Sequence, residues 1–388
     1  MLKSISDAVS EHKEEIKKLS DRIHANPELG FEEEKACKWQ IEVLKKWGFK
    51  VENPMSGLKT AYRASYGNGS PTVCFMSEYD ALAGLGHACG HNLIMTNALT
   101  AGLAVKKLMQ KEKLKGRVII MGTPAEEGKG GKEIMIREKA FKRIDMVLTS
   151  HPYDKTSTDP GWISLSGFTV EFRGLAAHAS AAPDQGINAL DAVNLLFSGV
   201  NAWRQQLPES VRIHGIINKG GELTNVIPEH TKCEFYLRAD TAGLAEKIEA
   251  RFRRIVKGAA MMTDTKYQIK PSRITYKCSV LNKPLNDEFF NVAEEAGLTP
   301  EYQLGGGRGS TDFGNVSQII PGASFFFAIA KAPCPLHSID FEKAAGTAKA
   351  FNQAFKTGQA MAAIGLKFMK DKNFRDEVNK DFKKRTKT

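Results

Sequence analysis

Residues 76–92 decide the fold, and they run Met76-Ser77-Glu78-Tyr79-Asp80-Ala81-Leu82-Ala83-Gly84-Leu85-Gly86-His87-Ala88-Cys89-Gly90-His91-Asn92. Carboxylates, imidazoles and a thiol are concentrated in this one segment. The apolar run 72–76 before it predicts a buried strand, and residues 93–111 after it predict a helix. Because the junction of a strand with a helix is the usual place for a site in an open α/β sheet, we expect a functional site here.

Cys89 and His91 are candidate metal ligands. A single glycine separates them, so both side chains can face the same point without a Cβ between them. Thiolate and imidazole are ligands that zinc and similar metals prefer. A buried cysteine beside the start of a helix is equally common in an ordinary protein core, so this pair alone leaves both interpretations open.

Two further apolar runs end in residues of the same kind. The run 117–122 is followed by Glu126 and Glu127, which would repel each other without a cation nearby, although acidic residues are also common at the start of a helix. The run 145–150 leads directly into His151. Three strands that each end in ligand-type residues favour a metal site at the carboxyl edge of a sheet.

Length and composition limit the class of protein. A chain of 388 residues exceeds what one hydrophobic core usually supports, so we expect two domains. It contains no apolar run long enough to span a bilayer and no signal-peptide core, which predicts a cytoplasmic protein without a membrane partner. The six cysteines show no disulfide-framework spacing, as expected in a reducing compartment.

The net charge of +11 does not by itself indicate nucleic-acid binding. Residues 367–388 carry nine Lys or Arg against four acids, so the excess of positive charge is concentrated in the tail. This pattern favours a solvated helix face over a binding arm. Because no zinc-finger spacing or RNP-like motif accompanies it, we expect no nucleic-acid partner.

The pattern changes between residues 167 and 277. The predicted order is β-α-β-β-α-β, which is typical of a ferredoxin-like layer with helices on one face. Core-type patterns resume afterwards, so we predict a catalytic domain in two parts, 1–166 and 278–388, and an inserted lid or dimerisation domain, 167–277. The glycine-rich loop 305–309 lacks the lysine of a phosphate-binding loop.

Hydrophobic periodicity predicts the individual elements. The helices are expected at residues 5–24, 32–47, 93–111, 188–205, 244–261, 285–296 and 341–369. The strands are expected at residues 60–65, 72–76, 117–122, 145–150, 168–173, 211–217, 232–238, 266–276 and 323–330.

An ordered set of motifs spans nearly the whole chain: C-G-H (89–91), P-A-E-E-G (124–128), S-H-P (150–152), G-x-x-A-H-A-S (174–180), G-x-N-A (186–189), N-V-I-P-E (225–229), G-S-T-D-F-G (309–314) and L-H-S (336–338). In this order the set resembles the metal-dependent amidohydrolases of the aminoacylase and carboxypeptidase-G peptidase superfamily. The C-G-H form is similar to the branch of indole-acetyl amino-acid hydrolases, hippurate hydrolases and aminobenzoyl-glutamate hydrolases. The resemblance implies an α/β fold: a zinc-peptidase-like catalytic domain with a central, mostly parallel sheet and an inserted ferredoxin-like α+β domain.

The resemblance also implies roles for single residues. It implies two divalent metal ions, zinc or manganese, held by Cys89, His91, Glu127, His151 and His337, with Cys89 shared between them. Glu126 would be the general base that takes a proton from a metal-bound water, and Asp80 would orient a ligand. His178 would stabilise the oxyanion, although the residues alone favour an ordinary loop histidine there. Substrate contacts would come from Asn225, Arg238, Ser310 and Asp312, and for Asn225 and Arg238 a structural surface pair is an equal alternative.

Two positions depart from the family pattern, and a nearby histidine is a decoy candidate for a ligand. Glu78 stands where many relatives carry aspartate or histidine, and Asn92 stands where aspartate is common in the branch. His87 precedes His91 by four residues, but the pattern does not use it.

The expected function is hydrolysis of the amide bond in an N-acyl amino acid or dipeptide-like small molecule. Hydrolytic deamination, or another C–N cleavage on the same scaffold, is one alternative, and a non-catalytic metal-binding or ligand-binding homologue is another. We expect a homodimer or homotetramer, because the edge of the inserted layer offers a pairing surface.

Overall fold

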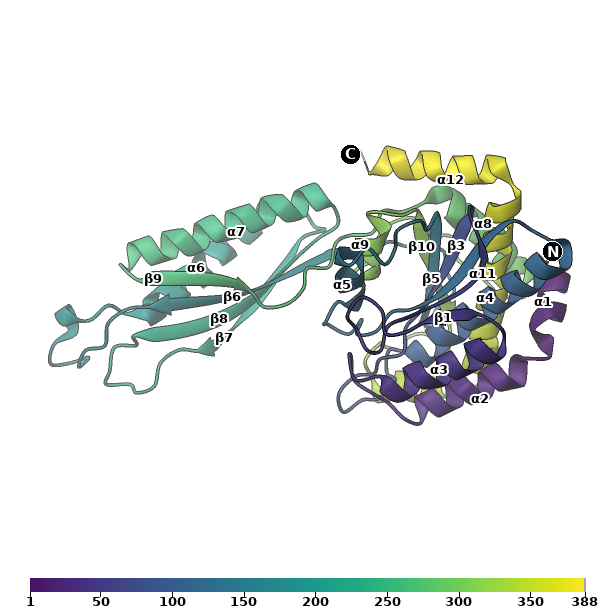
Figure 1. Cartoon of the computed structure of the whole chain (residues 1–388). Coiled ribbons are helices and arrows are strands. Elements are labelled where there is room, and N and C mark those ends of the chain that lie inside the picture. The colour runs from purple at the N-terminus through teal and green to yellow at the C-terminus, as the bar shows by residue number, and fades with distance from the viewer. Residues whose placement is uncertain (387–388) are drawn as a thin grey trace. The chain divides into compact units, whose positions relative to one another are not determined.

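The computed structural model describes residues 1–386, so Lys387 and Thr388 at the end of the basic tail lie outside the described residues. The chain forms two compact units. Unit 1 contains Met1–Gly161, Ser279–Gly307 and the chain from Asp312 onward, and unit 2 contains Trp162–Cys278 and Arg308–Thr311. Figure 1 labels the elements of both units.

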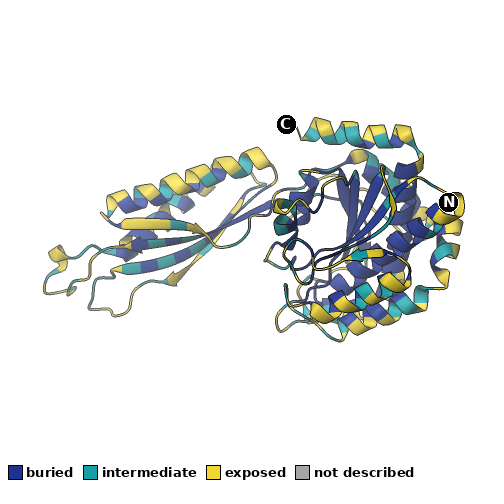
Figure 2. Cartoon of the chain, viewed as in Figure 1, coloured by how far each residue is buried: buried dark blue, intermediate teal, exposed yellow. Residues whose placement is uncertain are grey.

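Unit 1 is built on a six-stranded, mostly parallel sheet, as the sequence predicts. Its strand order is β1 (Lys50–Glu52), β2 (Tyr62–Asn68), β4 (Gly116–Gly122), β3 (Thr72–Ser77), β5 (Met146–Tyr153) and β10 (Gly322–Ala328). The last four run parallel, whereas β1 and β2 pair antiparallel at one edge. Every residue of β3 is buried, which explains its continuous apolar run (Figure 2).

The helices of unit 1 enclose this sheet. They are α1 (Leu2–Ser10), α2 (Lys13–His24), α3 (Glu34–Lys46), α4 (His91–Glu112), α5 (Gly131–Arg137), α8 (Lys283–Glu295), α9 (Phe313–Ser317), α10 (Ile339–Ala345), α11 (Ala348–Lys370) and α12 (Lys372–Arg385). Helix α4 is buried along almost its whole length, because the sheet covers one side and α1, α2 and α11 contact the others. Gly102 allows the close approach to the sheet, since a Cβ there would lie 2.3 Å from Ile120 Cγ1.

Several predicted elements are divided or shorter in the structure. The helix predicted at 5–24 is interrupted between α1 and α2, and the helix predicted at 341–369 is divided into α10 and α11. The second break has a local cause, because the Thr347 side chain accepts a hydrogen bond from the Ala350 amide and starts a new helix. The strand predicted at 266–276 ends at Pro271, which has no amide hydrogen to donate to a neighbouring strand. Strand β1 and helices α5 and α9 were not among the predicted elements, whereas α12 forms in the basic tail, for which the sequence favours a solvated helix face.

Unit 2 has the predicted ferredoxin-like order. It consists of β6 (Ser164–Arg173), a short 3-10 helix (Pro183–Gln185), α6 (Ala189–Arg204), β7 (Arg212–Lys219), β8 (His230–Ala239), α7 (Ala242–Met262) and β9 (Lys266–Pro271). The sheet is antiparallel with the order β7-β8-β6-β9. Alternate side chains of β8, including Cys233, Phe235 and Leu237, belong to the core that α6 and α7 complete. The mixed architecture of the two units confirms the predicted fold class.

Across the described residues 1–386, every helix is too short or too polar to cross a bilayer.

The core of unit 1 gives the first prediction. Phe325 is fully buried in the middle of β10, and its ring stacks on Phe289 with 3.9 Å between ring centroids. Phe325→Ala should therefore lower the free energy of unfolding by about 3 to 5 kcal/mol in urea titrations of the whole chain. Ile319→Ala is the control, because Ile319 is exposed and its loss should cost less than about 0.5 kcal/mol. Equal losses in the two variants would contradict this account of the core.

Candidate metal centre

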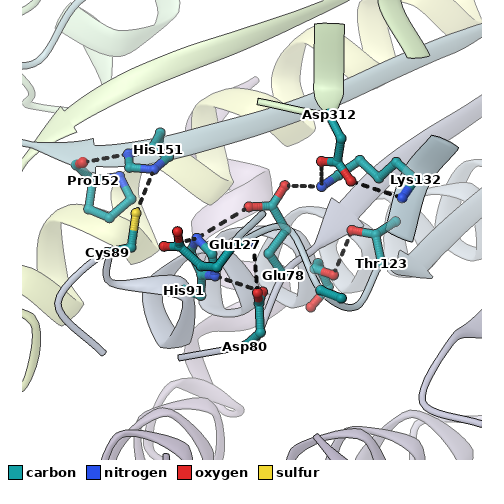
Figure 3. Close-up of polar contacts among 12 residues, drawn as sticks. Glu78, Asp80, Cys89, His91, Thr123, Glu127, Lys132, His151, Pro152 and Asp312 are labelled. Atoms are coloured by element: carbon teal, nitrogen blue, oxygen red, sulfur yellow. Dashed lines mark hydrogen bonds and ion pairs between the residues drawn. The ribbon is translucent and has the colours of Figure 1, made fainter. Parts of the chain in front are cut away.

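The carboxyl ends of the parallel strands bring the predicted ligands together in unit 1. Strand β3 leads to Asp80 and then to Cys89 and His91 at the start of α4, whereas β4 leads to Glu126 and Glu127. His151 lies within β5, and His337 lies in the loop that follows β10. Figure 3 shows most of these side chains converging from different segments.

Three overlapping groups of side chains can each hold a metal ion: Cys89 with His91 and His151, Cys89 with Glu127 and His337, and His91 with Glu126 and Glu127. Within each group the ligand atoms lie within 4.8 Å of one another. All five predicted ligands occur in these groups. Cys89, His91 and Glu127 each belong to two of the three groups.

His91 is oriented by Asp80. The Nδ1 atom of His91 lies 2.9 Å from Asp80 Oδ1, so the ring donates through Nδ1 and its Nε2 faces the other ligands. Nε2 forms no hydrogen bond with the described residues and lies 3.9 Å from Glu127 Oε1. Burial alone would lower the pKa of His91, but the charges of Asp80 and Cys89 outweigh it and raise that pKa, so these neighbours favour positive charge at the position of the ring.

His151 presents the same ring nitrogen. Its Nδ1 donates to the carbonyl oxygen of Pro152 at 2.7 Å, which leaves Nε2 as the acceptor side of a neutral ring. The Cys89 thiol, with Sγ 3.3 Å from Nε2, then donates to His151. Burial and the charge of His91 lower the pKa of His151 to about 4, so the imidazole is neutral, as a metal ligand must be.

Carboxylate crowding marks the other side of the centre. Burial and the charge of Glu127 raise the pKa of Glu126 well above its usual range, and Asp312 and Glu78 act in the same direction. Glu127 Oε1 lies 3.7 Å from His337 Nε2 and forms no hydrogen bond with the described residues. A bound divalent cation would offset the repulsion between these carboxylates.

The distances between the donor atoms match shared coordination of a metal ion better than direct hydrogen bonds. Distances of 3.7 Å and 3.9 Å from Glu127 Oε1 to the two imidazole nitrogens are too long for hydrogen bonds. Two donors each about 2.0 to 2.3 Å from one tetrahedral metal ion lie roughly 3.3 to 3.8 Å apart, which is close to these values. The set of thiol, imidazole and carboxylate donors suits zinc and tolerates manganese.

Lys132 supplies a fixed positive charge beside the centre. It is fully buried at the start of α5, and its Nζ lies 2.7 Å from Glu78 Oε1 and 2.5 Å from Asp312 Oδ1. Burial alone would lower the pKa of Lys132, but the charges of Asp312, Glu78 and Glu126 outweigh it and raise that pKa. The lysine therefore ties the end of β3 to the start of α9 (Figure 3).

Other predicted residues lie elsewhere. His178 is exposed in unit 2, where its Nδ1 accepts a hydrogen bond from the Ala181 amide at 3.3 Å. The backbone carbonyl oxygen of Asn225 accepts a hydrogen bond from the Ala179 amide in the same loop. Arg238 donates to Ser310 Oγ at 3.0 Å, also within unit 2.

Asp312 belongs to unit 1, and both of its oxygens accept hydrogen bonds from Lys132. The resemblance implies that the Asp312 carboxylate contacts the substrate, but in the structure this carboxylate is paired with Lys132. His87 is buried and lies outside all three ligand groups.

The sequence reasoning missed two buried charges near the centre, Lys132 and Glu33. Lys132 follows a run of glycines and resembles an ordinary solvent-exposed lysine in the sequence. In the structure the preceding Gly131 packs tightly against Pro124, since a Cβ at Gly131 would lie 1.9 Å from the Pro124 carbonyl oxygen. Glu33 lies in the first turn of the helix predicted at 32–47, where an acidic residue is ordinary. The sequence did offer one signal for Lys132. The motifs contain more carboxylates than positively charged groups, so buried carboxylates there require a compensating cation.

The fold and the donor cluster define a class: a metal-dependent hydrolase that acts on C–N bonds, with its ligands at the carboxyl edge of a mostly parallel sheet. Comparison with protein families then assigns the chain more narrowly. Residues 74–357 match the model of peptidase family M20/M25/M40, and the chain belongs to that family. This membership confirms the resemblance stated from the motifs.

Curated relatives cover most of the chain. It is 32% identical to an Xaa-Arg dipeptidase of Mus musculus in an alignment 398 residues long, gaps included, which covers 97% of this chain and 91% of the relative. It is 33% identical to a component of the p-aminobenzoyl-glutamate hydrolase of Escherichia coli (strain K12) over 319 residues, which cover 77% of this chain and 66% of the relative.

Solved structures share the fold. A dinuclear metal binding peptidase of the M20 family from Bacillus subtilis matches with a TM-score of 0.71 and 18% identity over 92% of this chain and 99% of that one. An aminobenzoyl-glutamate utilization protein from Klebsiella pneumoniae matches with a TM-score of 0.69 and 17% identity over 92% and 97% of the two chains.

The ion pairs of Lys132 give the second prediction. Lys132→Met should lower the free energy of unfolding by about 3 to 5 kcal/mol, because it leaves Glu78 and Asp312 buried without their cation. Lys367→Met, which breaks a partly exposed pair with Glu288, is the control and should cost less than about 1 kcal/mol. Urea unfolding measures both. A loss no larger for Lys132→Met than for the control would contradict the role of Lys132.

Proposed function

We propose that the chain hydrolyses the amide bond of an N-acyl amino acid or dipeptide-like substrate. In this proposal two divalent cations, zinc or manganese, are held by Cys89, His91, Glu127, His151 and His337. The observation that carries it is the convergence of these five side chains, which come from four distant segments of the sequence, into overlapping groups of metal-binding geometry.

The residues of unit 1 have separate roles. Bound divalent cations polarise the scissile carbonyl and make a water molecule more acidic. Glu126, beside the ligand Glu127, takes the proton of the attacking water and delivers it to the leaving nitrogen. Asp80 keeps His91 in the tautomer that presents Nε2, because it accepts a hydrogen bond from the Nδ1–H group.

The residues of unit 2 are proposed to bind substrate. His178 accepts hydrogen bonds at Nδ1, so its Nε2 carries the proton and can donate to a developing oxyanion. Arg238 has the planar fork that suits a substrate carboxylate, and Asn225 and Ser310 add polar groups in the same unit. Asp312, in unit 1, fixes the chain near Ser310 through its contacts with Lys132.

The relatives support the substrate class. One is a dipeptidase and another hydrolyses p-aminobenzoyl-glutamate, and both names describe cleavage of an amide linked to an amino acid. We also propose a cytoplasmic location, supported by six free cysteines, and a homodimer or homotetramer that pairs through unit 2. The edge strand β7 supports such pairing, because it exposes Ile216 and Ile217.

The third prediction tests the general base. Glu126→Gln should lower kcat by roughly 100-fold to 10,000-fold against a panel of N-acyl amino acids and dipeptides, because an amide cannot accept the proton of water. The metal content should be unchanged. Glu138→Gln, an exposed carboxylate beyond α5, is the control and should keep the wild-type rate. A wild-type rate in Glu126→Gln would refute the assignment of the base.

Product analysis separates the alternatives. Release of a free amino acid supports amide hydrolysis, whereas release of ammonia indicates deamination on the same scaffold. A metal-loaded protein that binds members of the panel without turning them over would indicate a non-catalytic homologue.

The fourth prediction concerns the metal. Metal analysis of protein purified with zinc or manganese should give two ions per chain, and Cys89→Ala should reduce this number because the shared ligand is lost. Cys74→Ala is the control, since Cys74 is a buried thiol in β3 outside the ligand groups. Dialysis against a chelator should abolish turnover, and added metal should restore it. A full metal content in Cys89→Ala would contradict the shared thiolate.

A further inference from the structure

We infer that Glu33 is a positioning residue, which holds the loop carrying Glu126 and Glu127 in the geometry that proton transfer requires. The inference rests on the proposed function, since it assumes that Glu126 is the base. Glu33 lies at the start of α3, 93 residues before Glu126 in the sequence, in the first turn of the helix predicted at 32–47.

Both carboxylate oxygens of Glu33 are used. The side chain is fully buried, Oε1 accepts the backbone amide of Ala125 at 2.8 Å, and Oε2 accepts the hydroxyl of Thr60 at 2.9 Å. Thr60 is in turn held through its carbonyl oxygen by the hydroxyl of Tyr79, the neighbour of Asp80. A chain of buried hydrogen bonds therefore connects the turn before α3 with two segments of the metal centre.

Glu126 lies between two fixed amides. Glu33 holds the amide of Ala125 on one side, and Asp80 Oδ2 accepts the amide of Glu127 at 2.9 Å on the other. Two buried carboxylates thus fix the backbone immediately before and after the proposed base. This arrangement limits the rotation of the peptide groups that determine where the Glu126 side chain points.

The loop needs such support because its backbone is unusual. Ala125 has a φ of 60°, in the left-handed region that residues other than glycine seldom adopt. Gly30 packs against it so closely that a Cβ would lie 3.0 Å from Ala125 Cα, and the Gly30 carbonyl accepts Lys129 Nζ at 2.6 Å. Residues 30–33 therefore pack against the loop.

A capping role does not explain Glu33. It occupies the position before α3, but its side chain makes no capping hydrogen bond. Glu28 does this instead, because its carboxylate accepts the amides of Lys35 and Ala36. The Glu33 carboxylate is thus directed at the loop and not at the helix.

The experiment compares two replacements of similar size. Glu33→Gln keeps both contacts, since its amide oxygen can accept from Ala125 and its amide nitrogen can donate to the Thr60 hydroxyl. Burial and the charge of Asp80 raise the pKa of Glu33 to about 7, so a neutral side chain is a fair substitute. Glu33→Met keeps the volume and removes both acceptors.

We expect a split between kcat and KM. Glu33→Met should lower kcat by about 10-fold to 100-fold, with KM changed by less than about 3-fold and both metal ions retained, because displacement of a catalytic group by an ångström can cost this much. Glu33→Gln should restore kcat to within about 3-fold of wild type. If Glu33→Met does not fold, Glu33→Asp, which is one methylene too short to reach Ala125, should show the same split.

The matched control is Gln40→Met. Gln40 is also buried in α3 and accepts hydroxyls from Tyr62 and Ser77, so its replacement should lower the melting temperature without changing kcat. Wild-type kcat in a folded Glu33→Met, or an equal loss in Gln40→Met, overturns the inference. Glu126→Gln, assayed in parallel, keeps the two claims apart: an active Glu126→Gln removes the proposed base, whereas an inactive one beside a fully active Glu33→Met removes only the positioning role.

Discussion

The concentration of buried negative charge at one edge of a sheet is the constraint on which unit 1 depends. Glu78, Asp80, Glu126 and Asp312 are buried, and Glu127 is mostly so. Isolated carboxylates in such surroundings are costly, and each needs a cation or several hydrogen bonds. Lys132 pairs directly with Glu78 and Asp312, whereas His91 and the Glu127 amide donate hydrogen bonds to Asp80. The carboxylates of Glu126 and Glu127 are neighbours at this edge, and the metal ions are proposed to bind there.

The same edge explains the choice of ring nitrogens. Asp80 and the Pro152 carbonyl each accept a hydrogen bond from the Nδ1–H group of one histidine, so both rings offer Nε2 to the centre. The tautomers are thus set by residues that are adjacent to strand ends and are buried with them. Rigid supports of this kind reduce the reorganisation needed when ligands and substrate bind.

Much of this could be predicted from the sequence, because the signals are local. The apolar runs of β3, β4 and β5 follow from strands covered on both faces, and each ends in the residues that gather in the metal groups. The breaks before α2 and α11 could not be predicted from periodicity, since the apolar spacing continues across them. Glu33 and Lys132 were missed for a different reason: their partners are up to 180 residues away, and charged residues ordinarily face water.

The insertion of unit 2 has a consequence for the order of assembly during translation. Strand β10, helix α11 and His337 all follow residue 278, whereas β1 to β5 and the other ligands precede unit 2. A ribosome must therefore complete most of the inserted unit while β5 still lacks its outer neighbour and the ligand set lacks one histidine. During that interval the nascent chain carries an unpaired apolar edge, a feature that favours aggregation until β10 is added.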